Sequence, residues 1–372
     1  MILNTYYMKV NTLIISLLVA FTTFLYAQED SVKMVVAKNV EIDSSGIDPE
    51  AQKAYNEGIT AFENKNYTSA IAAFSKAIEI APEFTKAYSN RGYTNIALEK
   101  YSEAEIDFLE VISQDASLDK IHFELGALAE MTDSLHKAIR HYSNAIASNS
   151  KEEAYHYQRG IQYFKLGEYE KAKDDFTGAI LLKKDFADAY NDRGSANKLL
   201  DNIQDAIQDY RSATIHDPQM VLAFNNLGSA YRLKGDYIKA IQAYSKAIVL
   251  DEDNYLALNN RGYAKFENED FDGALQDFLK VIQIKKDYAS AYNNIAGVYL
   301  KKENYDKAIE YSTKAIENDK NLGIAYYNRG VAYEMNREVE KACEDWSEAS
   351  NLGVEIADKY FQSTSCGNLI SK

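Results

Sequence analysis

The sequence predicts an all-α protein: a right-handed superhelical solenoid of nine tandem helix-turn-helix repeats, each about 34 residues long, followed by a C-terminal capping helix. One pattern of small and aromatic residues returns with this period over 51–356, without an insertion or a deletion. The composition suits helices packed through aromatic side chains, with 3 prolines, 17 glycines and 29 tyrosines in 372 residues. Because a solenoid grows by adding repeats, this length does not require several globular domains.

The repeat at 221–254 displays the pattern in both of its halves. Apolar and small residues recur there at three- and four-residue spacing, so each half has one apolar helix face. These residues are Phe224, Leu227, Gly228 and Tyr231, then Tyr237, Ala240, Tyr244 and Ala247. The segment 234–236 between the halves predicts a turn. Gly228 and Ala240 are small enough to let the two helices approach closely. One such pair is too small to fold alone, so it needs neighbours.

The other eight repeats carry the same residue types in register. The Ala240 position is alanine in all nine repeats, and the Gly228 position is glycine in all but one, which has Ala296. The Tyr244 position is aromatic except at Ser312. Over about four-fifths of its length the chain therefore resembles the tetratricopeptide repeat family, whose repeat is a helix-turn-helix of this length. It departs from that family in having few prolines near the repeat ends.

Residues 1–27 predict a signal peptide and hence an exported protein, periplasmic or extracellular. Lys9 is their one charged residue, and the apolar run at 13–25 is too short for an ordinary membrane span. Ala27 offers a cleavage site before a polar stretch. An uncleaved N-terminal anchor is the alternative; after cleavage we expect no integral membrane span. Residues 28–50 predict a flexible linker.

Both ends of the repeat array have recognisable signals. Asp48 and Pro49 predict the start of the first helix, as its N-cap and first residue. Residues 357–372 predict a cap that covers the last apolar face. Cys343 and Cys366, the two cysteines of the chain, both lie in this C-terminal region. In an exported protein they predict a disulfide that fastens the cap.

Charge and motifs exclude several functions. The formal net charge is −15, and removing the signal peptide removes one base, which argues against nucleic acid and anionic membrane surfaces as partners. No phosphate-binding loop or nucleophile motif is present, so we expect no enzyme, no catalytic residues and no cofactor. We also expect no metal site. His136 and His141 are poorly spaced for two ligands on one helix face, and His122 and His156 share a packing position.

Five repeats carry arginine at the seventh position and aspartate sixteen residues later. The pairs are Arg91 and Asp107, Arg159 and Asp175, Arg193 and Asp209, Arg261 and Asp277, and Arg329 and Asp345. The four repeats without the arginine also lack the aspartate. This coupling predicts a partly shielded ion pair across each helix hairpin. A basic ligand-binding stripe is the alternative, but each arginine already has an acid assigned to it.

Asparagine recurs at the sixth position of the repeats, and at the fifth in the C-terminal half. The sixth-position residues are Asn56, Asn90, Asn226, Asn260, Asn294 and Asn328, and the fifth-position residues are Asn225, Asn259 and Asn293. The resemblance implies that first helices line a concave groove and that these amides bond the backbone of an extended peptide. A side-chain amide offers both a donor and an acceptor, as a peptide unit does. The alternative is that asparagine is only a favourable surface residue here.

These expectations favour a non-catalytic protein-interaction scaffold whose groove takes an extended segment of another protein. The groove positions of the last four repeats balance Arg232 and Lys301 against Glu267 and Glu334, which suits backbone recognition. A glycan-binding or regulatory subunit of a cell-envelope enzyme complex is the alternative, because Tyr55 and other aromatic residues occupy N-terminal groove positions.

Overall fold

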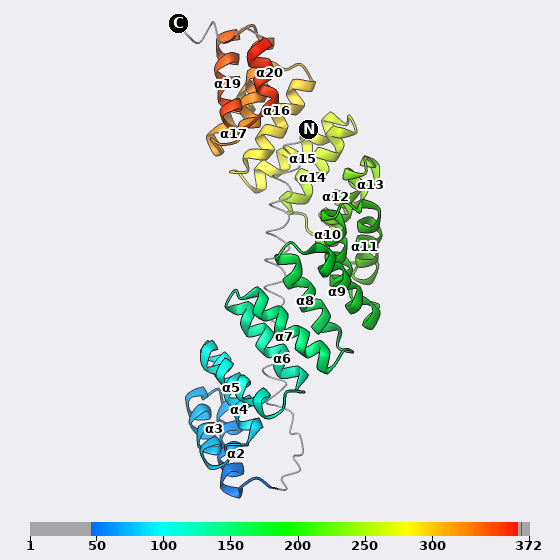
Figure 1. The fold of residues 1–372 in the computed structure, drawn as a ribbon. Coiled ribbons are helices and arrows are strands. Elements are labelled where there is room, and N and C mark those ends of the chain that lie inside the picture. The colour runs from blue at the N-terminus through cyan, green and yellow to red at the C-terminus, as the bar shows by residue number, and fades with distance from the viewer. Residues whose placement is uncertain (1–45, 364–365, 367–372) are drawn as a thin grey trace. The chain divides into compact units, whose positions relative to one another are not determined.

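The structure, a computed structural model, describes residues 46–363 and Cys366. The predicted signal peptide and linker up to residue 45 lie outside the described residues, as do parts of the predicted cap (364–365 and 367–372). Within the described range all regular secondary structure is α-helical, so the predicted fold class is confirmed (Figure 1). None of the helices in residues 46–363 is long and apolar enough to cross a membrane.

Nine helix pairs follow one another, and a shorter helix ends the array. Their bounds are α2 Pro49–Glu63, α3 Tyr67–Ile80, α4 Thr85–Ala97, α5 Tyr101–Gln114, α6 Asp119–Met131, α7 Leu135–Ser148, α8 Glu153–Lys165, α9 Tyr169–Leu182, α10 Ala187–Leu199, α11 Ile203–His216, α12 Val221–Leu233, α13 Tyr237–Leu250, α14 Tyr255–Glu267, α15 Phe271–Ile284, α16 Ala289–Lys301, α17 Tyr305–Asn318, α18 Gly323–Met335, α19 Val339–Asn351 and α20 Glu355–Ser363. From α4 to α18, each first helix of a pair begins one repeat length after the preceding one.

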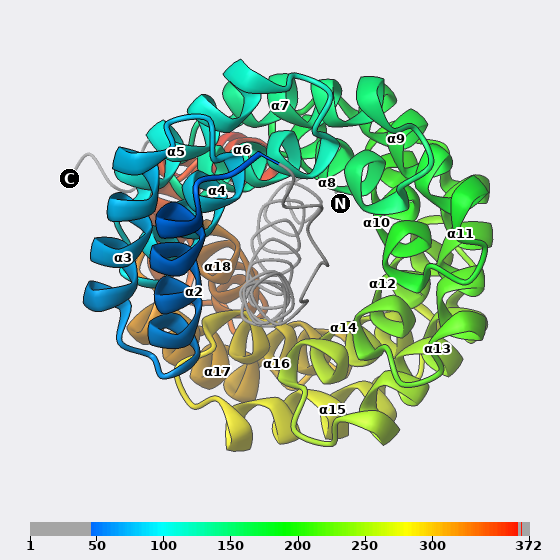
Figure 2. The ribbon, with the colours of Figure 1, turned by 90° about the horizontal axis from the view of Figure 1, so that it is seen from below.

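The chain divides into two compact units, with the boundary inside α10. Among the described residues, the first comprises 46–196 and the second comprises 197–363 with Cys366. Within each unit the first helices of the pairs line the inner side and the second helices the outer side, as α6 and α7 or α14 and α15 show in Figure 2. We call the surface formed by the first helices of a unit its inner face.

Glycine at the eighth repeat position lets the second helix place a ring against the first helix. A Cβ atom added to Gly228 would lie 2.7 Å from Tyr244, and one added to Gly58 would lie 2.5 Å from Phe74. Both distances are too short for carbon atoms in contact. The eighth repeat, 289–322, departs at both positions together, with Ala296 facing the short and buried Ser312. The two sequence exceptions therefore compensate each other.

A left-handed residue ends the first helix of every pair, always at the same repeat position. These residues are Lys65, Glu99, Asp133, Gly167, Asp201, Gly235, Glu269, Glu303 and Arg337, with φ between 54° and 80°. The N–H of Asp236 then donates to the carbonyl of Tyr231 (2.9 Å), as in a Schellman motif. The turn predicted at 234–236 is confirmed.

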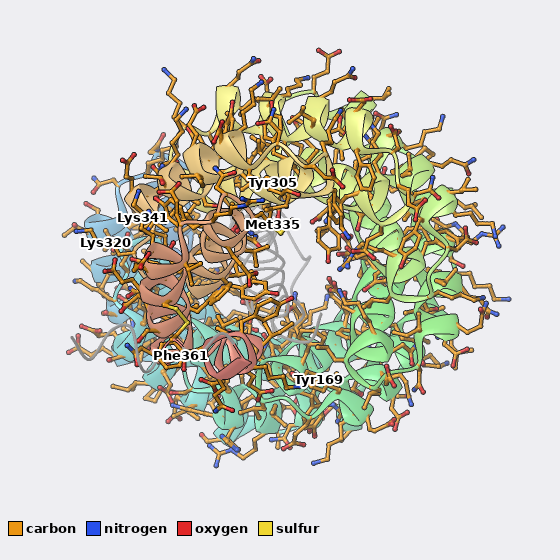
Figure 3. All side chains as sticks on the ribbon, turned by 90° about the horizontal axis from the view of Figure 1, so that it is seen from above. Tyr169, Tyr305, Lys320, Met335, Lys341 and Phe361 are labelled. Atoms are coloured by element: carbon orange, nitrogen blue, oxygen red, sulfur yellow. A yellow bond between two sulfur atoms is a disulfide. The ribbon has the colours of Figure 1, made fainter. Side chains whose placement is uncertain are left out.

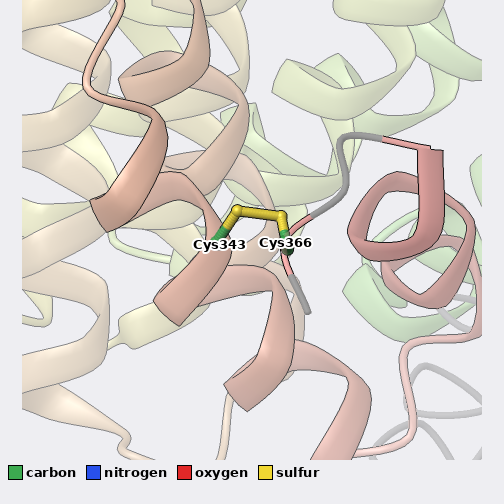
Figure 4. Close-up of a disulfide and its surroundings, with 2 residues drawn as sticks. All are labelled: Cys343 and Cys366. Carbon is green, nitrogen blue, oxygen red and sulfur yellow. A yellow bond between two sulfur atoms is a disulfide. The ribbon is translucent and has the colours of Figure 1, made fainter. Parts of the chain in front are cut away.

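Both ends of the array have the expected local chemistry. Asp48 caps α2 as predicted, because its Oδ1 accepts from the N–H of Glu50 at 2.7 Å and Pro49 opens the helix. At the other end Tyr360 of α20 packs its ring against Trp346 of α19, with centroids 5.3 Å apart. Figure 4 shows Cys343 of α19 joined to Cys366 beyond α20, with Cα atoms 5.3 Å apart, a usual separation for a disulfide.

Candidate functional site

The inner face of the second unit carries a ladder of asparagine side chains. Each sixth-position amide donates from Nδ2 to the Oδ1 of the fifth-position asparagine in the preceding repeat. The three bonds run from Asn260 to Asn225 (3.1 Å), from Asn294 to Asn259 (3.0 Å) and from Asn328 to Asn293 (2.8 Å). The donor and acceptor are 35 residues apart in each case, so the ladder joins consecutive first helices.

Part of each amide is used between repeats, and part remains for a ligand. The bond to Asn225 occupies one N–H of Asn260 and leaves its Oδ1 and its second N–H. Asn225 keeps its own N–H donors, because it takes part as an acceptor. Asn226, Asn259 and Asn293 are buried, whereas the remaining members of the ladder are partly exposed. The sequence pattern did not reveal the inter-repeat bond, because it does not give the distance between side chains on consecutive first helices.

The first unit makes the same contact between fifth and sixth positions with other residues. Asn90 is buried and donates to the hydroxyl of Tyr55 at 2.8 Å, and the hydroxyl of Tyr157 donates to Asp192 at 2.8 Å. Asn56 is exposed and accepts from Gln52 on α2 (2.9 Å). It borders a depression of about 720 Å³ on the first helix pair.

Carboxylates on this inner face have raised pKa values. Burial raises the pKa of Glu124 to about 7, although a hydrogen bond from Tyr93 lowers it in part. Burial also raises the pKa of Asp192 to about 6, opposed by the bond from Tyr157. The first unit therefore presents acids that titrate near neutral pH, whereas the second presents amides. The two inner faces differ in chemistry as well as in sequence.

The aromatic residues at N-terminal groove positions belong to the core. The ring of Tyr55 lies 4.9 Å from that of Phe84, and the ring of Tyr157 lies 4.7 Å from that of Phe186, centroid to centroid. Phe123 packs in the same way against Tyr155 (5.1 Å). Rings engaged in such contacts have less surface for stacking on a sugar.

Four of the arginine–aspartate pairs lie in ion-pair contact across their helix hairpins. The Nη2–Oδ1 distances are 2.6 Å for Arg91 and Asp107, 2.7 Å for Arg159 and Asp175, 2.6 Å for Arg261 and Asp277, and 2.7 Å for Arg329 and Asp345. In the fifth repeat Asn197 donates to Asp209 at 2.9 Å. Burial raises the pKa of Asp107 and of Asp345, and the adjacent arginine opposes that rise. The aspartates therefore lose solvation in exchange for the ion pair.

Each of the five arginines also reaches back to the preceding repeat, which the sequence analysis missed. Nη1 donates to a hydroxyl sixteen residues earlier. The bonds are Arg91 to Ser75 (2.9 Å), Arg159 to Ser143 (3.0 Å), Arg193 to Thr177 (3.1 Å), Arg261 to Ser245 (3.1 Å) and Arg329 to Thr313 (3.2 Å). A sequence signal existed, because that position holds Leu109, Arg211 or Leu279 where the following repeat lacks arginine. The arginine thus fastens two repeats together.

Two of the five histidines lie in the core of the third repeat. His122 and His141 are buried with ring centroids 6.1 Å apart, and burial lowers the pKa of His141 to about 4. His156 lies near Asp175, with Nδ1 3.8 Å from Oδ1. Among the described residues no group of three or more His, Cys, Asp or Glu side chains is arranged to hold a metal ion. The imidazole of His141 lies near the positive charges of Lys137 and Arg140, which disfavour the binding of a metal cation there.

Comparisons with known proteins agree with this architecture. Models described as tetratricopeptide repeat match residues 55–119, 157–214, 221–254 and 289–322, and one described as TPR repeat matches 262–303. A curated relative, Protein STIP1 homolog of Dictyostelium discoideum, is 38% identical over 90 residues. The match spans 23% of this chain and 15% of that protein.

Solved structures show the same fold at low sequence identity. A tetratricopeptide repeat protein from Parabacteroides merdae superimposes with a TM-score of 0.54 at 18% identity, over 66% of this chain and 98% of that one. The C-terminal part of a TPR repeat-containing protein from Cytophaga hutchinsonii gives 0.53 at 20% identity, over 64% and 98%. A chain of the Cut9–Hcn1 complex of APC/C gives 0.51 at 14% identity, over 92% and 81%. The chain belongs to the tetratricopeptide repeat family.

Proposed function

We propose that the protein is a non-catalytic protein-interaction scaffold that binds an extended segment of a partner along the inner face of its second unit. Family membership supports the scaffold role, since repeat arrays of this kind use extended surfaces for binding. The single observation that carries the finer proposal is the asparagine ladder. In successive repeats its amide donors and acceptors occupy the same positions of the first helix.

The ladder matches an extended backbone in spacing. Packed helices lie about 8–10 Å apart and an extended chain advances about 3.3 Å per residue, so each repeat would meet about three peptide residues. Every amide contact contributes about 0.5–1.5 kcal/mol net, so affinity requires several repeats acting together. Because the ladder is mostly uncharged, it would read the backbone and leave the choice of sequence to neighbouring side chains.

A variant that keeps the bonds between repeats but replaces the N–H donors available to a ligand with acceptors tests this proposal. Changing Asn225, Asn259 and Asn293 to Asp preserves the acceptor oxygen for each inter-repeat bond, but replaces the remaining N–H donors with a carboxylate. We expect capture of the partner from the native compartment to fall at least tenfold, because bonds to backbone carbonyls are lost. The helical circular dichroism should be unchanged.

The matched control places the same three charges away from the ladder. Asn66, Asn254 and Asn304 are N-cap residues, and Asp is as well tolerated as Asn at that position. Changing these three to Asp should leave partner capture intact. Equal capture by both triple variants and the wild type would show that the ladder serves repeat packing alone.

We infer that the protein acts after export, in a periplasmic or extracellular location. The predicted signal peptide and the pairing of Cys343 with Cys366 support this address, since disulfides persist in oxidising compartments. Cell fractionation with N-terminal sequencing should find a chain that begins after Ala27. A full-length chain in the cytoplasm would overturn this part of the proposal.

A further inference from the structure

Gly297 lies in the middle of α16, where the packing of the array does not explain a glycine. Glycine weakens a helix relative to alanine, so it needs a reason there. Gly228 has one in the ring of Tyr244 that packs against it, and Gly235 has another in its left-handed φ of 80°. Gly297 has neither. Its φ is not positive, and a Cβ built on it would meet none of the described atoms within 4 Å outside its neighbours in the helix.

The open space at Gly297 adjoins the asparagine ladder. Asn293 and Asn294 precede the glycine by four and three residues, so all three lie on one face of α16. Asn293 accepts the ladder bond that comes from α18, and Asn294 donates the ladder bond that leads to α14. The glycine therefore leaves an opening beside the place where two consecutive ladder bonds meet.

Apolar side chains border this opening on both sides. α16 contacts the neighbouring first helices α14 and α18, which carry Tyr263 and Val331 at the same repeat position as Gly297. Leu300 lies one turn further along α16, and all three bordering side chains are partly exposed. Phe266 stacks on Tyr263 with ring centroids 6.4 Å apart, which enlarges the apolar wall on α14. We call the space above Gly297, bordered by Tyr263, Leu300 and Val331, the Gly297 opening.

The opening belongs to one repeat alone in the sequence. The ninth position holds a side chain in the other eight repeats, namely Ile59, Tyr93, Ala127, Ile161, Ser195, Ser229, Tyr263 and Val331. The repeat architecture is therefore compatible with a side chain at this position, and the room around Gly297 would accept one. Because packing within the array does not require the glycine, the space that it leaves can serve a ligand.

An extended peptide on the ladder would bring its side chains to the Gly297 opening. Alternate side chains of an extended chain point to opposite sides, so about every second residue would face the inner face. The tyrosine, leucine and valine around the opening favour a large apolar side chain, because its burial against them removes apolar surface from water. A charged side chain would lose its hydration there without gaining an ion pair from these three residues.

We propose that the Gly297 opening is a subsite for one large apolar side chain of the bound segment, such as Leu, Met or Phe. This inference rests on the proposed function and adds a sequence preference to it. The ladder would hold any extended backbone, whereas the subsite determines which residue of the segment lies at the eighth repeat. It thereby sets the register of the segment along the inner face of the second unit.

Peptide selection tests the subsite without a purified partner protein. A random peptide library displayed on nucleic acid would be selected against the chain from residue 28 to its end, in parallel with Gly297→Leu and Ser290→Leu variants. Gly297→Leu fills the opening. Ser290→Leu is the control, because it adds the same side chain to the same face of α16 two turns earlier. The adjacent repeats already carry Leu256 and Ile324 at that position.

We expect wild type and control to enrich peptides with a large apolar residue at one fixed position, and Gly297→Leu to lose that preference. Replacing this residue by glycine in a resynthesised peptide should weaken wild-type binding about tenfold or more. Gly297→Leu should bind the glycine peptide at least as well as the parent peptide, because its own leucine occupies the same space.

The outcomes separate the subsite from the proposed function. Enriched peptides without an apolar preference overturn the subsite alone. A preference that Gly297→Leu retains, or that Ser290→Leu loses equally, also overturns the subsite alone. Absence of any enriched peptide overturns the proposed function with it.

The stability of the free protein provides a second readout that is independent of peptides. Gly297→Ala should raise the urea midpoint of unfolding or leave it unchanged, because alanine favours the helix and its Cβ meets open space. Gly262→Ala gives the contrast, since its Cβ would lie 2.7 Å from Phe278 and should lower the midpoint. A midpoint lowered by Gly297→Ala would show that this glycine serves folding, which contradicts the subsite.

Discussion

At the residue scale, the arginine of the seventh position has two partners on opposite sides. Arg261 donates to Asp277 within its own hairpin and to Ser245 in the repeat before it. Arginine suits this role because its guanidinium carries five donors in a fixed plane. Repeats that lack the arginine also lack its aspartate and hydroxyl partners, and they carry apolar or unrelated residues at those positions. A buried ion pair can be exchanged for packing in this way at little net cost.

Double-mutant cycles should measure this pairing. Arg261→Ala combined with Asp277→Ala should give a coupling free energy of order 1 kcal/mol in chemical denaturation. The coupling of Arg329 with Asp345 should be larger, because Lys265 also lies 2.9 Å from Asp277 and partly replaces Arg261. Purely additive effects in both cycles would show that neither ion pair contributes to stability.

Ala296 and Ser312, which replace the glycine and the aromatic residue in the eighth repeat, predict that substitutions at these two positions are coupled in their effect on stability. Gly262→Ala places a Cβ 2.7 Å from Phe278 and should cost about 1–3 kcal/mol of unfolding free energy. In a Phe278→Ser background the same change should cost nothing further, since Ala296 and Ser312 already coexist in the chain. Chemical denaturation of the two single variants and the double variant decides this. An undiminished Gly262→Ala penalty beside Ser would reject the steric explanation.

At the element scale, the sequence determined helix positions through local signals. The repeat period placed every first helix from α4 to α18 at its observed start. The cap at Asp48 and the turn at Gly235 followed from residue chemistry. Left-handed residues such as Lys65 and Arg337 could be located only by register, because their side chains do not favour that conformation. The inter-repeat bonds could not be predicted, because they depend on helix separation.

The capping helix should depend on the cysteine pair. A link between Cys343 and Cys366, which are 23 residues apart, would contribute about 3 kcal/mol in the chain-entropy model. Non-reducing mass spectrometry of protein from its native compartment should find the two cysteines joined. In a Cys343→Ser, Cys366→Ser variant, hydrogen exchange should accelerate first in α19 and α20, with α14 unchanged. Two alkylatable thiols in the isolated protein would contradict this prediction.

At the scale of the whole molecule, the acidic net charge suits the proposed role, in which a partner segment binds the inner face of the second unit. The asparagine side chains of the ladder are uncharged, so the net charge of −15 comes from residues outside it. Charged side chains, such as Lys320 and Lys341 in Figure 3, lie on the outer side of the last repeats. Each repeat contacts chiefly its neighbours, so stability and binding both build up along the array. The sequence predicted the repeat architecture but not the partner, since the proposed recognition of a peptide backbone would leave little trace in the sequence of the receptor.

Photo-crosslinking along the array tests the central claim most directly. Benzoylphenylalanine would be introduced singly at inner positions Leu256, Ser290 and Ile324 of the second unit. The exposed outer positions Ile238, Asp272 and Asp306 serve as controls. An extended ligand predicts crosslinks from all three inner positions to one partner segment, advancing by about three residues per repeat. Crosslinks from outer positions, or from a single inner position only, would contradict an extended peptide along the inner face.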